Sequence, residues 1–315
     1  MNSANGQQAS QAQWAAQRLR AQLLKPGIVV CPGVYDGITA RLALRSNFDC
    51  LYMTGAGTGM SRLGMADLGM TNLSDMVANA GMIASLDRKV PLIADADTGY
   101  GGPLMVARTV REYMTAGVAA LHLEDQVVAK RCGHLANKEL VDEATYLARV
   151  KAAALAREEL RATTGADIVL IARTDSLQLL GYDAAVARLK RALEAGADVA
   201  FLEGMTTIGQ CQRVCKDLAP APVLLNMVAG GVTPDLSVQE AADLGFKIVI
   251  FPLVALGLVC EEVEKAMQNL KRTLRADVSE VQKTGGVKHM FNVCGMAESL
   301  EFDAKAGGSA FTNGV

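Results

Sequence analysis

The sequence predicts an α/β protein built as a closed (β/α)8 barrel, a TIM barrel. Short apolar runs, often rich in β-branched residues, recur along the chain, and each is followed by a longer stretch with helical periodicity. This alternation is typical of repeated β-α units and a parallel sheet. Eight runs favour a closed barrel over an open doubly wound sheet. The runs begin at Ile28, Cys50, Pro91, Val118, Ile168, Val199, Val223 and Ile248.

The stretches between these runs predict helices that mix Ala, Leu and Val with charged residues. Gly117, Gly196 and Gly245 lie where the C-caps of such helices are expected. The clearest predicted helices span 104–116, 142–162, 183–195 and 237–244.

The first residues, 1–26, are expected to form a helical segment that packs on the fold. Trp14, Leu19, Leu23 and Leu24 lie at roughly helical spacing. The alternative is an organelle transit peptide, because the first 35 residues contain basic side chains and no Asp or Glu. The helical pattern favours the packed helix.

The last residues, 258–315, predict a long helix followed by a Gly-rich tail. Met290, Phe291 and Phe311 are isolated apolar residues in this tail, and we expect them to pack on a partner subunit. No internal repeat and no low-complexity linker interrupts the chain. Residues 1–315 are therefore expected to form a single barrel domain.

Composition narrows the function to small-molecule chemistry. The formal net charge is -2 and the basic residues are spread along the chain, so no nucleic-acid partner is expected. No apolar run reaches the ~18 residues that a membrane span needs. Seven cysteines at irregular spacing, without a zinc-type pair or a secretory signal, indicate a reducing compartment. We expect a cytoplasmic protein, with a mitochondrial location as the alternative.

The most informative stretch is 121–134, in which an apolar strand ends in acid and opens into a loop that holds one cysteine. Lys130 and Arg131 directly precede Cys132. Neighbouring positive charge favours the thiolate over the thiol, so we expect the acidity of this cysteine to be tuned. The alternative is an ordinary solvated loop. Because the loop follows a strand end, where barrel enzymes place catalytic groups, the functional interpretation is favoured.

Acidic residues end several of the predicted strands. Asp95 and Asp97 close the third run, and their spacing projects both carboxylates to one side of an extended chain. Glu124 closes the fourth. Carboxylates that converge repel one another unless a hard cation lies among them, and oxygen ligands point to Mg²⁺ or Mn²⁺. These three acids are the predicted metal ligands; helix capping or pairing with basic neighbours is the alternative.

Other residues at the strand ends suit an anionic substrate. Arg173 offers a planar fork for a carboxylate, and the turn from Thr54 to Gly57 offers backbone N–H groups. His122 lies within an apolar strand, so a supporting role is expected for it, whereas His134 on the loop is the better active-site candidate.

Together these residues resemble the isocitrate lyase and phosphoenolpyruvate mutase superfamily, from about Pro32 to Pro252. The motifs that carry the resemblance are PGVYD from Pro32, the Thr54-Gly55 turn, Asp67 in GMADLG, ADADTGYGG from Ala94, LEDQ from Leu123, KRCGH from Lys130, ARTD from Ala172, LEG from Leu202, and Asn226. The resemblance implies a β/α barrel that binds magnesium and a 2-oxo or 2-hydroxy carboxylate. It also implies a homotetramer in which a terminal helix is exchanged between subunits.

The resemblance also implies roles for individual residues. Asp95, Asp97 and Glu124 would form the metal shell, partly through water. Cys132 would be the proton donor on a loop that closes over substrate. The other catalytic residues implied are Lys130, His134 and Arg173. The substrate-binding residues implied are Tyr52, Thr54, Gly55, Ala56, Asp67, Gly133, Arg173, Glu203 and Asn226.

A cysteine in this loop is typical of the carbon-carbon lyases of the superfamily. The implied reaction is retro-aldol cleavage of a 2-hydroxy dicarboxylate, leaving a 2-oxo acid and an enolate-like fragment that needs a proton. Members that cleave the tricarboxylate 2-methylisocitrate carry an arginine after the eighth strand, where this chain has Gly257. A substrate like 2,3-dimethylmalate is therefore expected; cleavage of oxaloacetate to oxalate and acetate, then methylisocitrate cleavage, are the alternatives.

Two functions of other classes are considered. A dehydrogenase is suggested by GAGTG from Gly55, but the third glycine of the dinucleotide motif would fall at Met60. A non-catalytic scaffold or carbohydrate-binding barrel predicts that the acids are surface charges.

Overall fold

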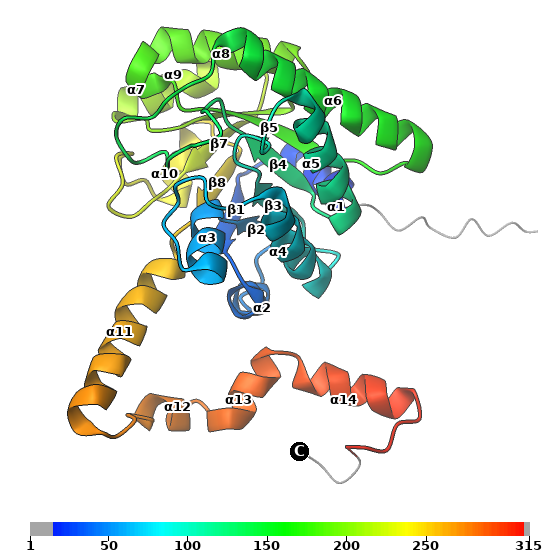
Figure 1. The fold of residues 1–315 in the computed structure, drawn as a ribbon, viewed down its shortest axis with the longest axis vertical. Helices are drawn as coiled ribbons and strands as arrows, with labels where there is room; N and C mark the ends of the chain where they lie inside the picture. Colours follow the sequence, from blue (N-terminus) through cyan, green and yellow to red (C-terminus); the bar gives the residue numbers. More distant parts are fainter. Residues whose placement is uncertain (1–14, 312–315) are drawn as a thin grey trace, which may run out of the picture.

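The computed structural model describes residues 15–311, except for the side chains of residues 280 and 281. All eight strands are parallel and pair in chain order, and β8 returns to β1, so the sheet closes into a barrel (Figure 1). The predicted (β/α)8 barrel is confirmed. The strands are β1 (Val29–Val34), β2 (Leu51–Met53), β3 (Leu92–Asp95), β4 (Ala120–Leu123), β5 (Val169–Thr174), β6 (Val199–Leu202), β7 (Val223–Asn226) and β8 (Ile248–Phe251).

Helices surround the barrel on its outer side (Figure 1). The four helices predicted between strands are confirmed as α5, α6, α8 and α10, with small shifts at their ends. From α1 to α10 the helices are α1 (Ala15–Leu24), α2 (Gly37–Arg45), α3 (Gly55–Leu63), α4 (Leu73–Leu86), α5 (Pro103–Ala116), α6 (Glu143–Thr164), α7 (Leu177–Leu180), α8 (Tyr182–Glu194), α9 (Ile208–Asp217) and α10 (Val238–Asp243).

The glycines expected at helix ends adopt backbone conformations that side chains disfavour. Gly117 is the C-cap of α5, with φ of 88°. Gly196 and Gly245 lie one residue beyond the caps of α8 and α10, with φ of 115° and 100°. Each turns the chain back toward the next strand without the steric cost that a Cβ would add.

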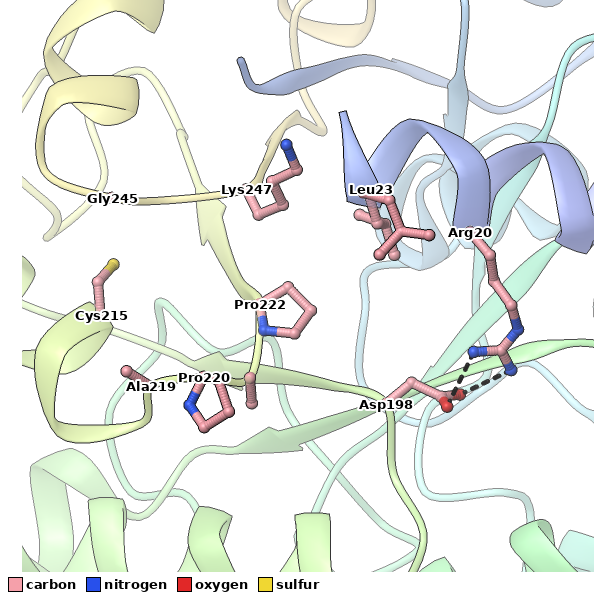
Figure 2. A pocket seen from close by; sticks show the side chains of 11 residues that line it. Arg20, Leu23, Asp198, Cys215, Ala219, Pro220, Pro222, Gly245 and Lys247 are labelled. Carbon is pink, nitrogen blue, oxygen red and sulfur yellow. Dashed lines mark hydrogen bonds and ion pairs between the residues drawn. The ribbon is translucent and has the colours of Figure 1, made fainter. Parts of the chain in front are cut away.

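Helix α1 closes the amino-terminal end of the barrel. Leu19 is fully buried and packs with side chains of the barrel interior, such as Ile93 and Val169. Arg20 of α1 lies 2.7 Å (Nε to Oδ2) from Asp167 and 3.0 Å (Nη1 to Oδ1) from Asp198; Figure 2 shows the second contact. The helix predicted near the start of the chain is confirmed where the structure describes it; Trp14 lies outside the described residues.

The C-terminal helices leave the barrel as an arm (Figure 1). Of the residues of α11, Leu256 is buried. The apolar residues singled out in the tail are exposed: Met290 by 49 %, Phe291 by 53 % and Phe311 by 52 %. Their packing on a partner stays a prediction. The helices of the arm are α11 (Leu256–Thr273), α12 (Ser279–Lys283), α13 (Gly286–Val293) and α14 (Met296–Lys305).

Between residues 15 and 311, no helix has both the length and the apolar character that crossing a membrane requires.

We predict that Leu19→Ala destabilises the barrel by about 2–5 kcal/mol, because it leaves a cavity under the interior layer. The matched control is Leu24→Ala on the same helix, since Leu24 is 88 % exposed and its loss should cost less than about 0.5 kcal/mol. Urea unfolding followed by circular dichroism measures both variants. Equal effects of the two variants would show that α1 does not seal the barrel.

Candidate active site

A cavity of about 110 Å³ opens at the carboxyl ends of the strands. A water molecule occupies about 30 Å³ of liquid, so this space suits a small ligand. The predicted site residues that meet here come from β2, β3, β5 and β7, from the residues directly after β2 and β6, from α3, and from the loops after α3 and β4. The lining residues are Tyr52, Thr54, Ala56, Asp67, Asp95, Cys132, Gly133, His134, Arg173, Glu203, Asn226, Val228, Pro252 and Leu253.

Four other predicted residues lie behind the wall of the cavity. Asp97, Glu124 and Lys130 are buried close to it. Gly55 supports the wall, because a Cβ at this position would fall 2.2 Å from Oδ2 of Asp95. Glycine is therefore required for the close approach of α3 to β3.

A larger cavity, of about 580 Å³, lies at the opposite end of the barrel. Figure 2 shows Arg20 and Asp198 paired on one side of it and Lys247 on another. Lys247 donates hydrogen bonds to the backbone oxygens of Lys25 and Gly27. Both cations thus have protein partners, whereas catalytic groups of such barrels lie at the carboxyl rim. The smaller cavity is the candidate active site.

The predicted metal ligands include buried carboxylate oxygens that accept no hydrogen bond, although Lys130 and Arg173 form ion pairs with two of them. Both side-chain oxygens of Glu124 and Oδ1 of Asp97 are buried without a hydrogen bond. Oδ1 of Asp95 accepts a hydrogen bond from the backbone N–H of Asp97 at 2.8 Å. Burial raises the pKa of Glu124 well above its usual range, although Arg173 opposes the shift.

These oxygens fit a hydrated hard cation rather than a closed protein cage. Within the described part of the chain, no three carboxylate, imidazole or thiol groups are close enough together to enclose a metal ion. Mg²⁺ usually keeps several waters and takes one or two carboxylates from the protein. A buried oxygen that accepts no hydrogen bond, such as Oε1 of Glu124, is suitable for such an ion and its waters.

Lys130 is the cation of the protein that pairs with Asp97, one of the predicted metal ligands, and with Asp67. Its Nζ lies 2.6 Å from Oδ1 of Asp97 and 2.5 Å from Oδ1 of Asp67. Burial acts to lower the pKa of Lys130, but the surrounding carboxylates, Asp97 foremost, raise it well above the usual range. Burial also raises the pKa of Asp97 to about 6, against the attraction of Lys130.

The expectation that neighbouring positive charge favours the Cys132 thiolate is wrong. Burial raises the pKa of Cys132 above its usual range; a backbone hydrogen bond from His134 opposes the shift and the charge of Asp67 adds to it. Lys130 points its charge at Asp67 and Asp97, and Arg131 is exposed. Cys132 is therefore a thiol at neutral pH, which is the form that can donate a proton.

Arg173 is held by several carboxylates. Its Nε and Nη2 donate to the two oxygens of Asp175 at 2.9 and 3.1 Å. Nε also lies 3.3 Å from Glu124, and Nη2 lies 3.5 Å from Glu203. The guanidinium carbon lies 5.2 Å from the centre of the Phe201 ring. This edge of the fork is engaged by carboxylates of the protein; binding of a substrate carboxylate by Arg173 stays a prediction.

The histidines differ in environment. His122 is fully buried in the barrel, with Nε2 at 2.9 Å from the Tyr52 hydroxyl and Nδ1 at 3.6 Å from Oδ1 of Asp95. His122 thus lies in the barrel core next to the site, and a supporting role in the reaction stays a prediction. His134 lines the cavity, with Nε2 at 3.4 Å from Nδ2 of Asn226 and 3.7 Å from Oε1 of Glu203.

Sequence reasoning missed three residues near the cavity. Pro252 and Leu253 follow β8 and form an apolar part of the wall. Lys138 is buried beside the cysteine loop and contacts Gly133 and Asp175. The strand-end rule could have found Pro252, which ends the eighth apolar run. No signal in the sequence marks Lys138, because it lies in the second half of the loop between β4 and α6, away from any strand end.

Comparison with known proteins gives several strong matches. The family model described as phosphoenolpyruvate phosphomutase matches residues 19–271. The 2,3-dimethylmalate lyase of Eubacterium barkeri is 39% identical over 262 residues, 83% of this chain and 86% of that protein. A crystal structure of 2,3-dimethylmalate lyase has a TM-score of 0.92 and 53% identity, covering 96% of this chain and 99% of that chain.

Two further structures bear on substrate and metal. Oxaloacetate acetylhydrolase in complex with the inhibitor 3,3-difluorooxalacetate has a TM-score of 0.90 and 46% identity, covering 94% of this chain and 98% of that chain. A phosphonopyruvate hydrolase complex with oxalate and Mg²⁺ has a TM-score of 0.79 and 26% identity, covering 93% and 99%.

We predict that the His122 imidazole stays neutral until the pH falls to about 4. Burial lowers the pKa of His122 from 6.5 to about 4, although Asp95 opposes the shift. Because the folded-state pKa is depressed, the stability this group contributes is present above pH 6.5 and is lost as the pH falls toward 4. The ring ¹⁵N chemical shifts, assigned by their absence in His122→Gln, report the charge. A midpoint near 6.5 for this ring would contradict the prediction.

Proposed function

This chain belongs to the phosphoenolpyruvate phosphomutase family, and on that premise we propose that it is a carbon-carbon lyase that cleaves a 2-hydroxy dicarboxylate like 2,3-dimethylmalate. The proposed products are a 2-oxo acid and a carboxylate, pyruvate and propionate in this case. The observation that carries the proposal is the small cavity at the carboxyl rim, where the Cys132 thiol, the Arg173 guanidinium and the Asn226 amide face one space.

The proposed reaction is a retro-aldol cleavage without a co-reactant. A base takes the proton of the 2-hydroxyl group, the bond between carbons 2 and 3 breaks, and its electron pair leaves with the second fragment. That fragment is an enolate-like dianion and takes up one proton. A bound divalent cation, Mg²⁺ or Mn²⁺, would supply charge stabilisation to the 2-oxo acid end; Asp95, Asp97 and Glu124 are the residues proposed to hold it.

Cys132 is the proposed proton donor. The thiol lines the cavity, and its raised pKa, caused by burial, keeps it protonated at neutral pH. His134 and Glu203 lie close to Asn226, so these three are proposed to orient the oxygens of the substrate. Lys130 is proposed to hold Asp67 and Asp97 in place beneath the loop.

The size and polarity of the cavity support a dicarboxylate over a tricarboxylate. Among the described residues that line the cavity, Arg173 is the one guanidinium. After β8 the wall consists of Pro252 and Leu253, and Val228 lies on the cavity as well. These apolar side chains suit an alkyl substituent rather than a third carboxylate. Tyr52, Thr54, Ala56, Asp67 and Gly133 complete the proposed substrate site.

Oxaloacetate acetylhydrolase is the second candidate function. The observation that favours it is the similarity to a structure of that enzyme, at 46% identity over 94% of this chain. Methylisocitrate cleavage ranks below it, because the cavity lacks the second arginine among its described lining residues.

The proposal also covers the assembly of the protein, as a homotetramer, and its location, in a reducing compartment. The described helix α11 carries exposed apolar residues, among them Leu258, Val263 and Met267, which supports a homotetramer with an exchanged terminal helix. All seven cysteines are free thiols, which supports a reducing location such as the cytoplasm.

We predict that incubation with 2,3-dimethylmalate and Mg²⁺ yields pyruvate plus propionate, identified by ¹H NMR. The same samples with EDTA should show no turnover. Parallel incubations with 2-methylisocitrate and oxaloacetate separate the alternatives. Oxalate plus acetate as the dominant products, formed from oxaloacetate, would replace the lyase proposal by the acetylhydrolase.

We also predict that Cys132→Ser lowers kcat by at least about 100-fold while the KM changes little, because removal of a general acid typically costs 10²–10⁴-fold. The control is Cys260→Ser, since Cys260 is an exposed thiol on α11. Steady-state kinetics on the substrate found above measure both. Undiminished turnover in Cys132→Ser would exclude the thiol as the donor.

A further inference from the structure

The loop that carries Cys132 is closed at its base by a short antiparallel ladder. Gln126 and Leu140 form an isolated β-bridge, and the backbone N–H of Val127 donates to the carbonyl of Glu139 at 3.0 Å. This ladder fixes where the loop leaves the barrel and returns to it. The position of the tip, residues 130–134, depends on contacts farther along the loop.

At the tip, Gly133 lies directly on the buried ion pairs of the site. A Cβ at Gly133 would fall 2.4 Å from Nη2 of Arg173, 2.7 Å from Cγ of Glu203 and 2.9 Å from Oδ1 of Asp175. Such distances are far below van der Waals contact. The backbone of the tip is thus seated on the Arg173–Asp175 pair, and the adjacent Cys132 faces the cavity.

Lys138 connects this seat to the base of the loop. Its Nζ donates a hydrogen bond to the carbonyl of Gly133 at 2.7 Å and lies 3.3 Å from Oδ1 of Asp175. The side chain is 2 % exposed. Lys138 does not line the cavity that holds the other site residues, so the reaction proposed above gives this buried ammonium no chemical task.

We propose that Lys138 is a positioning residue that latches the Cys132 loop over the active-site cavity. One ammonium group binds a carbonyl of the tip and a carboxylate of the barrel, so the tip is tied to the same Asp175 that orients Arg173. The proposed proton donor, Cys132, and the guanidinium proposed to bind substrate, Arg173, are thereby held in a fixed position relative to each other. The catalytic part of this inference rests on the proposed function; the latch itself does not.

The experiment compares Lys138→Met with wild-type protein by site-resolved alkylation. Both are treated with iodoacetamide without substrate, and each cysteine is quantified by peptide mass spectrometry. Cys31 and Cys211 are fully buried and report global unfolding, and the alkylation rate of Cys132 is compared directly between the variants. The control variant is Lys190→Met, at an exposed position of α8.

We expect the alkylation rate of Cys132 to rise by about tenfold in Lys138→Met, the order expected when one charged hydrogen bond is lost. Cys31 and Cys211 should stay protected, and Lys190→Met should match wild type. With 2,3-dimethylmalate, kcat should fall by about tenfold while KM changes by less than about threefold, because the groups that bind substrate remain in place. If Lys138→Met does not fold, Lys138→Gln is used, with the same expected pattern.

Two results would overturn the latch. One is a Cys132 alkylation rate within about twofold of wild type, the level at which a change in loop opening is no longer resolved. The other is a joint rise at Cys31, Cys211 and Cys132, which would give Lys138 a purely structural role. If the wild-type protein turns over no tested substrate but Cys132 still becomes reactive in Lys138→Met, the latch stands and the proposed reaction fails.

Discussion

The site depends on a balance between buried carboxylates and a few buried cations. Asp95, Asp97, Glu124, Asp175 and Glu203 are all almost fully buried at one rim of the barrel. An unpaired charge in such a position costs several kcal/mol, about 3–5 kcal/mol when a partner is removed. Two side chains carry most of the compensation, and each does so for more than one acid. Lys130 contacts Asp97 and Asp67, and Arg173 contacts Asp175, Glu124 and Glu203. The loss of either cation would therefore leave more than one carboxylate without that partner.

The two principal cations of the site come from different kinds of element, a barrel strand and a loop. Arg173 belongs to β5 and is fixed by Asp175 and by the ring of Phe201. Lys130 comes from the loop after β4, so one of the two principal cations arrives only when that loop is in place. Loop position and charge neutrality are thus coupled by geometry. The same loop brings the thiol, whose pKa is raised because the loop buries it.

Much of this fold and part of the site could be predicted from sequence, for identifiable reasons. Each strand is an apolar run that ends at a polar residue, and the barrel gathers those ends at one rim. This is why Asp95, Arg173, Glu203 and Asn226 were predicted and do meet around one cavity. The acidity of Cys132 was predicted with the wrong sign, because neighbours in sequence do not reveal burial or where a charged side chain points. Lys138 was missed because one of its partners, Asp175, lies 37 residues away in the sequence, and the other, Gly133, lies on the same loop.

Arg20 and its carboxylates are separated by 147 and 178 residues along the chain. A ribosome delivers the N-terminal helix first, and Asp198 emerges only after five strands have been made. Until then the apolar side of Leu19 has no interior to cover. Long-range pairing of this kind slows folding, and Arg20 cannot complete its ion pairs before the chain has been made as far as Asp198.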